Sequence, residues 1–279
     1  MTQNTGFRLL TSLANPMGLR TIGVIPAHLE SQRLPRKPLR MICGRPMLAW
    51  VYEHALEAKC LDGLLVATDS SEILDFCRRS HMVARMTSAE HRSGTDRLVE
   101  VMQAEPADIY VNIQGDEPMV TAQHIELLLQ PFRAPHSNVI PAQAGIQVST
   151  LKVAITSAEA LNPNNVKVVT DCDGHALYFS RAIIPHDRDR SGSVKYYKHL
   201  GLYAYTAAAL EKFHSLPPSR LEQTEKLEQL RFLENGVPIV VLETKEDTIG
   251  VDTEEDLKKV EAYFAHTVDK HSRPKNSSR

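Results

Sequence analysis

The sequence predicts an α/β protein built around a mixed, mostly parallel β-sheet. Two kinds of segment alternate along the first half of the chain, short apolar runs bounded by turn residues and longer segments of helical periodicity. The apolar runs are at 21–26, 64–68, 82–86 and 109–114, and the helical segments are at 47–58, 72–79 and 95–103. Strands and helices that alternate in this way form parallel sheets covered by helices. The length of 279 residues, without a low-complexity linker, favours one compact unit.

The second half of the chain predicts antiparallel strands. Residues 166–170 and 177–180 flank Asp171-Cys172-Asp173-Gly174, a turn of the hairpin kind. The elements expected after it are a long strand at 198–206, helices at 207–214 and 222–234, a strand at 239–243 and a helix at 253–264. We therefore expect an antiparallel extension of the sheet.

Both ends of the chain are expected to lie outside the folded domain, which spans residues 21–264. Residues 1–20 hold no signal-peptide core and are predicted to be a flexible extension, with Met17 as an alternative start. Residues 265–279 are polar and basic, and they are predicted to form a disordered tail.

Composition excludes several classes of protein. The 32 basic and 34 acidic side chains give a net charge of -2, so no global positive field favours nucleic acid. The longest stretch without charged residues, 134–151, contains two prolines and a glycine, which argues against a membrane span. The four cysteines are too sparse for a disulfide framework, and we expect a cytoplasmic protein.

A basic loop follows the first predicted strand, at the edge of the sheet where doubly wound proteins bind ligands. It reads PAHLESQRLPRKPL over residues 26–39 and places Arg33, Arg36 and Lys37 within five positions. Arginine forks and a lysine ammonium suit a polyphosphate, although a solvated basic loop has the same composition. The sequence lacks both GxGxxG and GxxxxGK[ST], which argues against a dehydrogenase and a P-loop ATPase.

Two aspartates follow predicted strands at the same edge. Asp116 comes just after the strand at 109–114, which is a suitable place for a metal-binding carboxylate. Asp252 precedes the helix predicted at 253–264, so it is either a metal ligand or the N-cap of that helix. Local sequence alone leaves both alternatives open.

Three further patterns have both a functional and a structural interpretation. Ser93-Gly94-Thr95-Asp96-Arg97 begins a helix, where it can bind an anion or simply cap the helix. His199, Gly201, Tyr203 and Tyr205 share one face of a strand, which is either a ligand surface or a half-buried sheet face. Glu225 and Gln229 are four residues apart and are predicted to share one helix face, which is either an exposed polar face or a ligand-binding face.

The loop at 26–39 resembles the N-terminal signature of the 3-deoxy-manno-octulosonate cytidylyltransferases (CMP-KDO synthetases), usually PARxxSxRLPxKPL. The similarity extends from residue 21 to about residue 264. The other similar blocks are 91–97, 112–118, 162–169, 178–181, 199–203, 225–231 and 250–253. This resemblance implies a single-domain three-layer α/β/α nucleotide-diphospho-sugar transferase fold with an antiparallel sugar-binding and dimerisation extension.

The resemblance also implies a reaction. CMP would pass from CTP to the anomeric 2-hydroxyl of 3-deoxy-D-manno-octulosonate (KDO), releasing pyrophosphate and supplying lipopolysaccharide assembly. Family members are homodimers that use Mg²⁺, and Asp116 and Asp252 match their two metal-binding aspartates. Arg33 and Lys37 join this pair as expected catalytic residues, because they would neutralise phosphate charge.

Two sets of binding residues carry over from the same resemblance. CTP is expected to contact Pro26, Ala27, Arg33, Lys37, Thr68, Asp69, Ser93, Thr95, Arg97 and Gln114. KDO is expected to contact Gln114, Arg181, His199, Tyr203, Glu225 and Gln229. Glu117 and Asp256 are weaker carboxylate candidates. Glu117 is expected to satisfy local backbone or a basic neighbour, and Asp256 to face solvent or the helix dipole.

Two features depart from the family pattern. His28 stands where an arginine is usual, and residues 140–148, IPAQAGIQV, resemble a short insertion that we predict to be a loop. These departures keep open the alternative of a catalytically weakened CTP-binding homologue. A second alternative is cytidylyl transfer to another acidic sugar, 8-amino-KDO or sialic acid, because these sugars share the carboxylate and the anomeric hydroxyl.

Overall fold

The computed structural model describes residues 18–31, 33–91, 93–132 and 145–272. Its strands are β1 (Thr21–Ala27), β2 (Met41–Ile42), β3 (Arg45–Pro46), β4 (Gly63–Thr68), β5 (Ala84–Met86), β6 (Ile109–Asn112), β7 (Val148–Ile155), β8 (Lys167–Thr170), β9 (Ala176–Ser180), β10 (Tyr196–Thr206) and β11 (Ile239–Thr244). Its α-helices are α1 (Met47–Leu56), α2 (Ser71–Arg79), α3 (Gly94–Ala104), α4 (Ala122–Leu128), α5 (Ser157–Ala160), α6 (Ala207–Ser215), α7 (Arg220–Glu225), α8 (Leu230–Glu234) and α9 (Glu254–Ser272). Short 3₁₀ turns occupy Lys37–Leu39 and Gln130–Phe132.

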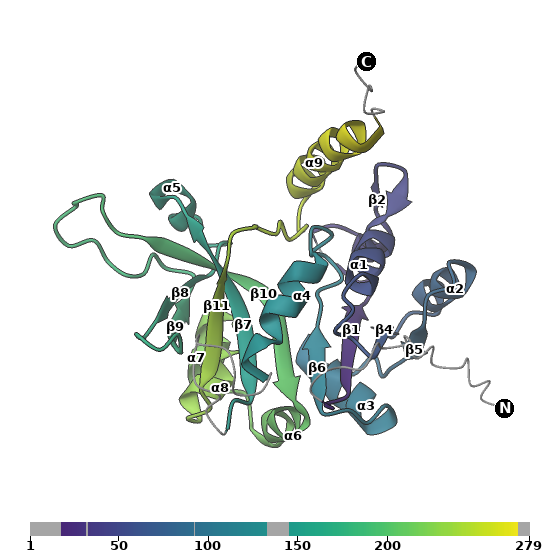
Figure 1. Cartoon of the computed structure of the whole chain (residues 1–279), viewed down its shortest axis with the longest axis horizontal. Helices are drawn as coiled ribbons and strands as arrows, with labels where there is room; N and C mark the ends of the chain where they lie inside the picture. The colour runs from purple at the N-terminus through teal and green to yellow at the C-terminus, as the bar shows by residue number, and fades with distance from the viewer. Residues whose placement is uncertain (1–17, 32, 92, 133–144, 273–279) are drawn as a thin grey trace, which may run out of the picture.

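A single mixed sheet organises the molecule, in the order β11-β7-β10-β6-β1-β4-β5 (Figure 1). β1 runs parallel to both β4 and β6, β4 to β5, and β11 to β7. β10 runs antiparallel to β6 and β7, and the β8–β9 hairpin joins the sheet through β10. The predicted mixed, mostly parallel sheet with an antiparallel extension is confirmed.

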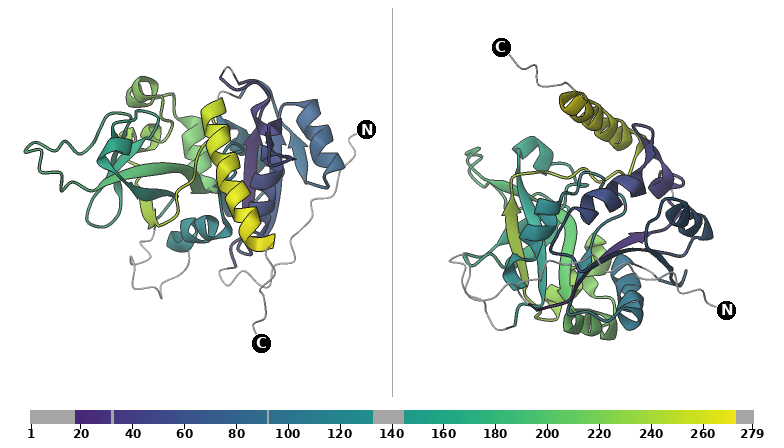
Figure 2. Two further views of the ribbon diagram at one scale, coloured as in Figure 1. Left: turned by 90° about the horizontal axis from the view of Figure 1, so that it is seen from above. Right: turned by 45° about the vertical axis from the view of Figure 1, so that its right-hand side comes forward.

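Helices cover both faces of this sheet (Figure 2). One apolar cluster joins α1, α2 and α4 to one face, and a second joins α3, α6 and α8 to the other. β4 shows the division, because Leu64 and Val66 belong to the first cluster while Leu65 and Ala67 belong to the second. A strand that is buried on both faces has a continuous run of apolar residues. This is why β4 could be predicted from the sequence. The three-layer prediction is confirmed.

A third, smaller cluster anchors the C-terminal helix α9. Leu257, Val260 and Phe264 pack against Leu34 of the basic loop and against β2, and Trp50 stacks on Phe264 with ring centroids 4.6 Å apart. The helix continues to Ser272, past its predicted end at residue 264, because neither proline nor glycine interrupts residues 254–272. The contact with Leu34 fixes the basic loop beside the start of α9.

The helix predicted at 222–234 is two helices. α7 ends at Glu225 and α8 begins at Leu230, because Lys226 adopts a left-handed conformation with φ of 57°. Glu222 and Arg231 bridge the two helices through buried contacts of 2.5 and 2.8 Å. The prediction that Glu225 and Gln229 share one helix face is therefore wrong.

The predicted insertion differs from the structure at its end. Val148, its last residue, is fully buried and begins β7, where it pairs with Tyr205 and Ile239. Residues 140–144 lie outside the described part of the chain, as do 1–17 and 273–279 of the ends predicted to be flexible, 1–20 and 265–279. Residues 265–272 of the predicted disordered tail belong to α9 instead. The short helices α4 and α5 were not predicted.

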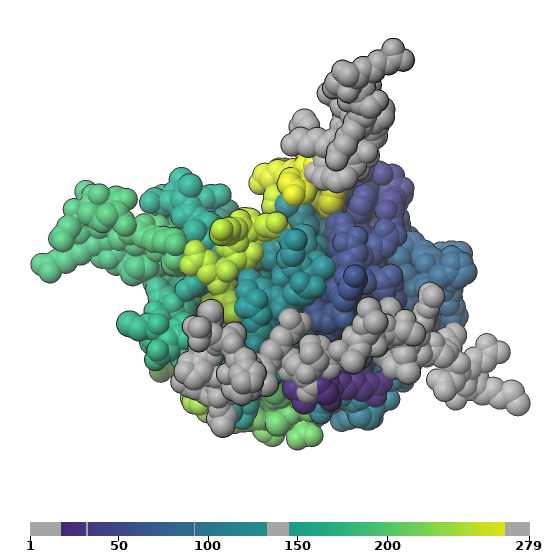
Figure 3. Space-filling view, viewed as in Figure 1, coloured from purple at the N-terminus to yellow at the C-terminus, as the bar shows by residue number. Residues whose placement is uncertain are grey.

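The connection between β9 and β10 extends away from the body of the molecule, to the left in Figures 1 and 3. Leu161, which follows α5, and Leu177 on β9 are 70% and 62% exposed. Within the described residues, no helix is both long and apolar enough to span a membrane.

Candidate active site

One lysine and two aspartates meet at the carboxyl edge of the sheet. The Lys37 Nζ lies 2.5 Å from Asp116 Oδ2 and 3.0 Å from Asp252 Oδ1. Arg33 Nη2 lies 2.9 Å from Asp252 Oδ2. Burial lowers the pKa of Lys37, but the two carboxylates outweigh it, so the pKa is raised. Burial raises the pKa of Asp252, but Lys37 and Arg33 outweigh it, so that pKa is lowered.

The backbone explains why residues 116 and 252 converge. The amide of Val251 donates to the carbonyl oxygen of Asp116 over 2.9 Å, which ties the two chain segments together. Asp256 and Thr253 form a reciprocal cap at the start of α9, with Thr253 Oγ1 donating to Asp256 Oδ2 over 2.8 Å. Of the two alternatives for Asp252, the cap is thus taken by Thr253, and the Asp252 carboxylate remains available to the cations.

The carboxylate pair fits a magnesium site. One oxygen from each of Asp116 and Asp252 lies within 3.0 Å of the same Nζ, so the two carboxylates converge on a single cation-sized position. Mg²⁺ typically takes one or two carboxylates and completes its shell with water and phosphate oxygens. The described residues contain no cluster of three or more His, Cys, Asp or Glu side chains suited to a metal, so a larger protein cage is not formed among them.

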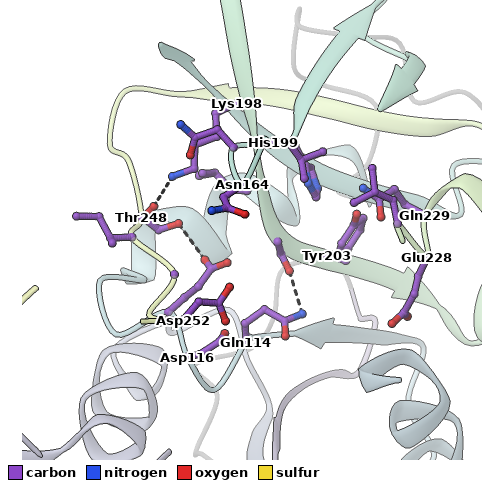
Figure 4. A pocket seen from close by; sticks show the side chains of 18 of the residues that line it. Gln114, Asp116, Asn164, Lys198, His199, Tyr203, Glu228, Gln229, Thr248 and Asp252 are labelled. Atoms are coloured by element: carbon purple, nitrogen blue, oxygen red, sulfur yellow. Dashed lines mark hydrogen bonds between the residues drawn. The ribbon is translucent and has the colours of Figure 1, made fainter. Parts of the chain in front are cut away.

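A cavity of about 810 Å³ extends from this pair under β10 (Figure 4). Asp116 and Asp252 line one end, Gln114 lies between, and Tyr203, Glu228 and Gln229 line the other end. Its other polar lining residues include Arg33, Thr95, Asn112, Glu117, Asn162, Asn164, Asn165, Arg181, Lys198, His199, Asp247, Thr248 and Asp256. Such a lining suits a hydroxylated, charged ligand.

Three buried polar atoms on this lining have no hydrogen-bond partner. They are Asn112 Oδ1, Tyr203 Oη and Gln229 Nε2. Each unsatisfied buried polar atom costs about 1–3 kcal/mol, so these three atoms are groups that water or a ligand in the cavity would satisfy. No other described side chain carries such an atom.

Two titratable side chains on the lining have strongly shifted pKa values. Burial, with Lys198 nearby, lowers the pKa of His199 to about 3, so its imidazole is neutral. Burial and the neighbouring Asp116 raise the pKa of Glu117 to about 7, and the Glu117 carboxylate accepts from Thr248 Oγ1 over 2.9 Å. The partner of Glu117 is thus a distant hydroxyl, whereas local backbone or a basic neighbour was expected.

A buried lysine holds the wall that carries Arg181. Lys167 Nζ donates to three carbonyl oxygens, at 3.0 Å to Asn162, 2.6 Å to Asn165 and 2.7 Å to Arg181. The Arg181 guanidinium donates in turn to the carbonyl oxygens of Glu225 and Pro163, at 2.8 and 3.2 Å. The loop before β8 and the end of β9 are thereby fixed to each other.

Glu225 does not reach the cavity, although it was predicted to contact the sugar. Its carboxylate accepts from Ser180 Oγ over 2.6 Å and from the Arg181 amide over 3.0 Å. The turn at Lys226 brings Glu228 to the lining instead. Sequence reasoning missed Glu228, and its position next to Gln229 was the available signal.

Several expected CTP contacts lie outside the lining of this cavity. Arg97 is 5% exposed, and its guanidinium donates to Thr87, to Asp69 Oδ2 over 2.8 Å and to the Ser88 carbonyl. Thr68 is fully buried. These contacts give Arg97 and Asp69 a structural connection between β4 and α3.

The remaining predicted residues surround the edge where β1 and β6 end. Ser93 caps α3 by accepting from the Asp96 amide over 3.1 Å, which is the structural interpretation of that motif. A Cβ on Gly115 would lie 2.7 Å from the Pro26 carbonyl oxygen, so glycine allows this close approach. Pro26 and Ala27 therefore lie close to the segment bearing Gln114. His28 is exposed.

Comparisons with known proteins agree with this geometry. A model of the cytidylyltransferase family matches residues 22–246. The 3-deoxy-manno-octulosonate cytidylyltransferase of Acidobacterium capsulatum is 56% identical over 243 residues, which cover 87% of this chain and 96% of that protein. The chain belongs to the 3-deoxy-manno-octulosonate cytidylyltransferases. The enzyme of that name from Lawsonia intracellularis is 46% identical over 254 residues, covering 90% of this chain and 96% of the relative.

One solved structure supports membership of the same family, and a second shows the fold alone. The structure of CMP:2-keto-3-deoxy-manno-octonic acid synthetase complexed with CTP superposes with a TM-score of 0.82 at 43% identity, covering 89% of this chain and 99% of that one. A cytidylyltransferase from Leptospira borgpetersenii, at 14% identity and a TM-score of 0.56, shares the fold. The predicted family and fold are confirmed.

Proposed function

We propose that this chain transfers CMP from CTP to the anomeric 2-hydroxyl of KDO, with release of pyrophosphate. The observation that carries this proposal is a cavity that runs from Asp116 and Asp252, the carboxylates paired with Lys37, to a buried, partly unsatisfied polar end. A cationic and metal-binding end suits a triphosphate, and a hydrogen-bonding end suits a polyol. Membership of the cytidylyltransferase family supports the same reaction.

In the reaction, the 2-hydroxyl oxygen of KDO attacks the α-phosphorus of CTP and loses its proton to solvent. The bond from the α-phosphorus to the bridging oxygen breaks, and pyrophosphate leaves with that electron pair. Lys37 and Arg33 are proposed to neutralise the charge that builds on the phosphates. Both lie within 3.0 Å of Asp252, at the end of the cavity where the triphosphate is proposed to bind. Alignment and charge neutralisation are the main contributions asked of the protein.

Asp116 and Asp252 are proposed to hold Mg²⁺, which when bound polarises phosphate oxygens and orients the nucleophile. Convergence of their oxygens on one position supports this assignment. In this structure the Lys37 ammonium lies between the two carboxylates. When Mg²⁺ binds there, Lys37 is proposed to pair with the phosphate oxygens of CTP instead. The cytosine end of CTP is proposed to lie toward Pro26, Ala27 and the start of α3.

The sugar is proposed to occupy the far end of the cavity. Gln114, His199, Tyr203, Glu228 and Gln229 offer donors and acceptors for hydroxyls, and two of them carry unsatisfied atoms. Arg181 is proposed to meet the carboxylate of the sugar acid, since a guanidinium fork matches a carboxylate. Its backbone contacts to Glu225 and Pro163 hold it at the wall.

We further propose a cytoplasmic homodimer. The exposed Leu177 on β9 of the antiparallel extension supports a contact between two copies there, and Leu161 after α5 is exposed as well. None of the four cysteines, all within the described residues, forms a disulfide, in keeping with a reducing compartment. Sedimentation of the protein, alone and as Leu177→Asp, tests the dimer, which the variant is expected to weaken.

Pyrophosphate release tests the reaction directly. The protein is assayed with CTP and Mg²⁺ against KDO, 8-amino-KDO and sialic acid, with Asp116→Ala as the control. Release with KDO that disappears in the control supports the proposal. Release only with another acid would reassign the substrate, and CTP binding without release would indicate a weakened homologue.

A further inference from the structure

The hydroxyl of Thr150 connects a break in the sheet to His199. Thr150 lies on β7, and its Oγ1 is 2.7 Å from the carbonyl oxygen of Leu202, 3.2 Å from that of Leu200 and 3.0 Å from His199 Nε2. The pairing of β7 with β10 shifts register between Leu200 and Tyr203, so the hydroxyl sits where the regular ladder is interrupted. Thr150 is fully buried.

Counting protons at this hydroxyl settles which ring nitrogen of His199 carries hydrogen. A hydroxyl has one proton, and carbonyl oxygens only accept hydrogen bonds. The Thr150 proton is therefore given to a carbonyl oxygen, with Leu202 the nearer at 2.7 Å. The contact with His199 then forms only if Nε2 carries a hydrogen and donates it to Thr150 Oγ1. The opposite arrangement would leave oxygen lone pairs facing each other in a buried site.

The rest of the surroundings keep the ring neutral and fixed. Burial lowers the pKa of His199 to about 3, and the neighbouring Lys198 ammonium acts in the same direction. The Phe179 ring meets the imidazole edge-on at 4.9 Å, and the Tyr203 ring lies 5.3 Å away. A neutral imidazole protonated on Nε2 presents a lone pair at Nδ1. His199 lines the cavity, between Lys198 and Tyr203 in Figure 4.

We propose that Thr150 is a positioning residue that fixes His199 as the Nε2–H tautomer, so that Nδ1 accepts a hydrogen bond from a hydroxyl of the bound sugar acid. The inference rests on the proposed function for the identity of the ligand. This tautomer of His199 also determines how the sugar acid is oriented in the cavity, because a lone pair at Nδ1 attracts a hydroxyl proton and repels a carboxylate oxygen. The sugar carboxylate is thereby directed to the cationic wall at Arg181.

Nitrogen NMR of the imidazole tests the tautomer without any substrate. In the full-length protein labelled with ¹⁵N-histidine, His199 is assigned by comparison with His199→Asn. The expected spectrum shows a protonated Nε2 and an unprotonated Nδ1. Thr150→Ser, which keeps the hydroxyl, is expected to give the same pattern, whereas Thr150→Val is expected to lose it.

Steady-state kinetics test the consequence for the sugar. Thr150→Val is expected to raise the KM for KDO about tenfold, the usual effect of one impaired buried hydrogen bond, and to leave the KM for CTP unchanged. Thr150→Ser is expected to restore the wild-type KM. Ser149→Ala is the matched control, because Ser149 is equally buried on β7 but donates to Leu128, away from the cavity.

The outcomes separate this inference from the proposed function. A hydrogen on Nδ1 of His199 in the wild-type protein, or equal KM values for Thr150→Val and Thr150→Ser, overturns the role of Thr150. Failure of the wild-type protein to release pyrophosphate with any sugar acid overturns the proposed function and the hydroxyl contact, and leaves the NMR result to judge the tautomer. Circular dichroism confirms that Thr150→Val is folded before it is interpreted.

Discussion

The polar side chains at the two ends of the cavity differ in how they are paired and solvated. At the carboxylate end the charges are paired with one another and partly solvated, with the Arg33 and Asp252 side chains 57% and 44% exposed. At the other end Tyr203 and Gln229 are uncharged and buried, and their Oη and Nε2 atoms have no hydrogen-bond partner. Solvated ion pairs exchange partners at low cost, whereas unsatisfied buried groups are already desolvated for a ligand. The comparison assigns chemistry to the first end and selectivity to the second.

Removing the ammonium at the carboxylate end should have the largest effect. Lys37→Met is expected to lower kcat by about 10²–10³-fold, the range found when one preorganised charge is removed from a transition state. The KM for KDO should not change, because the sugar end stays intact. Arg36→Met is the control, since Arg36 lies on the same loop but pairs with Glu72. An equal loss of kcat in Lys37→Met and Arg36→Met would contradict the assignment of chemistry to the carboxylate end of the cavity.

Removing an unsatisfied group at the sugar end should affect binding and stability in opposite directions. Tyr203→Phe deletes a buried hydroxyl without a partner, so the melting temperature of the free protein is expected to stay the same or rise. The KM for KDO is expected to rise about tenfold as one hydrogen bond is lost. A variant with a lower melting temperature and an unchanged KM would show that the hydroxyl is structural.

The wall between the two ends offers a comparison of two lysines. Lys167→Met removes all three donors that fix Arg181 and the loop at 162–166, so the KM for KDO should rise several-fold while the KM for CTP stays constant. Lys152→Met is the matched control, because Lys152 is also buried but donates to Thr170 outside the cavity. The same KM change in both variants would reduce Lys167 to a general stabilising role.

The smallest effect is expected where α9 begins. Thr253→Ala removes the cap that leaves Asp252 available, and the stability should fall by about 1 kcal/mol. Denaturant unfolding measures this loss, with Thr206→Ala, the cap of α6, as a comparison away from the cavity. We expect kcat to fall only in Thr253→Ala. An unchanged kcat would show that the cap does not control the position of Asp252.

Sequence patterns predicted the parallel half of the fold well, for a physical reason. Strands such as β4 are buried on both faces and appear as uninterrupted apolar runs, and helices such as α2 begin with a polar cap. The break between α7 and α8 was not predictable from periodicity. It depends on Lys226 in a left-handed conformation, which tertiary contacts such as Glu222 with Arg231 maintain.

The site divides in a similar way. Asp116 could be found locally, because it follows the predicted strand at 109–114, but Asp252 needed the long-range bond from the Val251 amide to the Asp116 carbonyl. Glu228 and Lys167 were missed because their roles depend on a turn and on three backbone carbonyls. Linear spacing does not record such contacts.

Kinetics of Asp252→Asn tests the central claim most directly. This change removes the charge from one member of the carboxylate pair, keeps its shape, and leaves the sugar end and the cap at Thr253 untouched. With saturating Mg²⁺ and CTP, kcat for KDO is expected to fall by about 10²-fold or more, with the KM for KDO unchanged. Full activity of Asp252→Asn, or a loss confined to the KM for KDO, would contradict the assignment of chemistry to this end of the cavity.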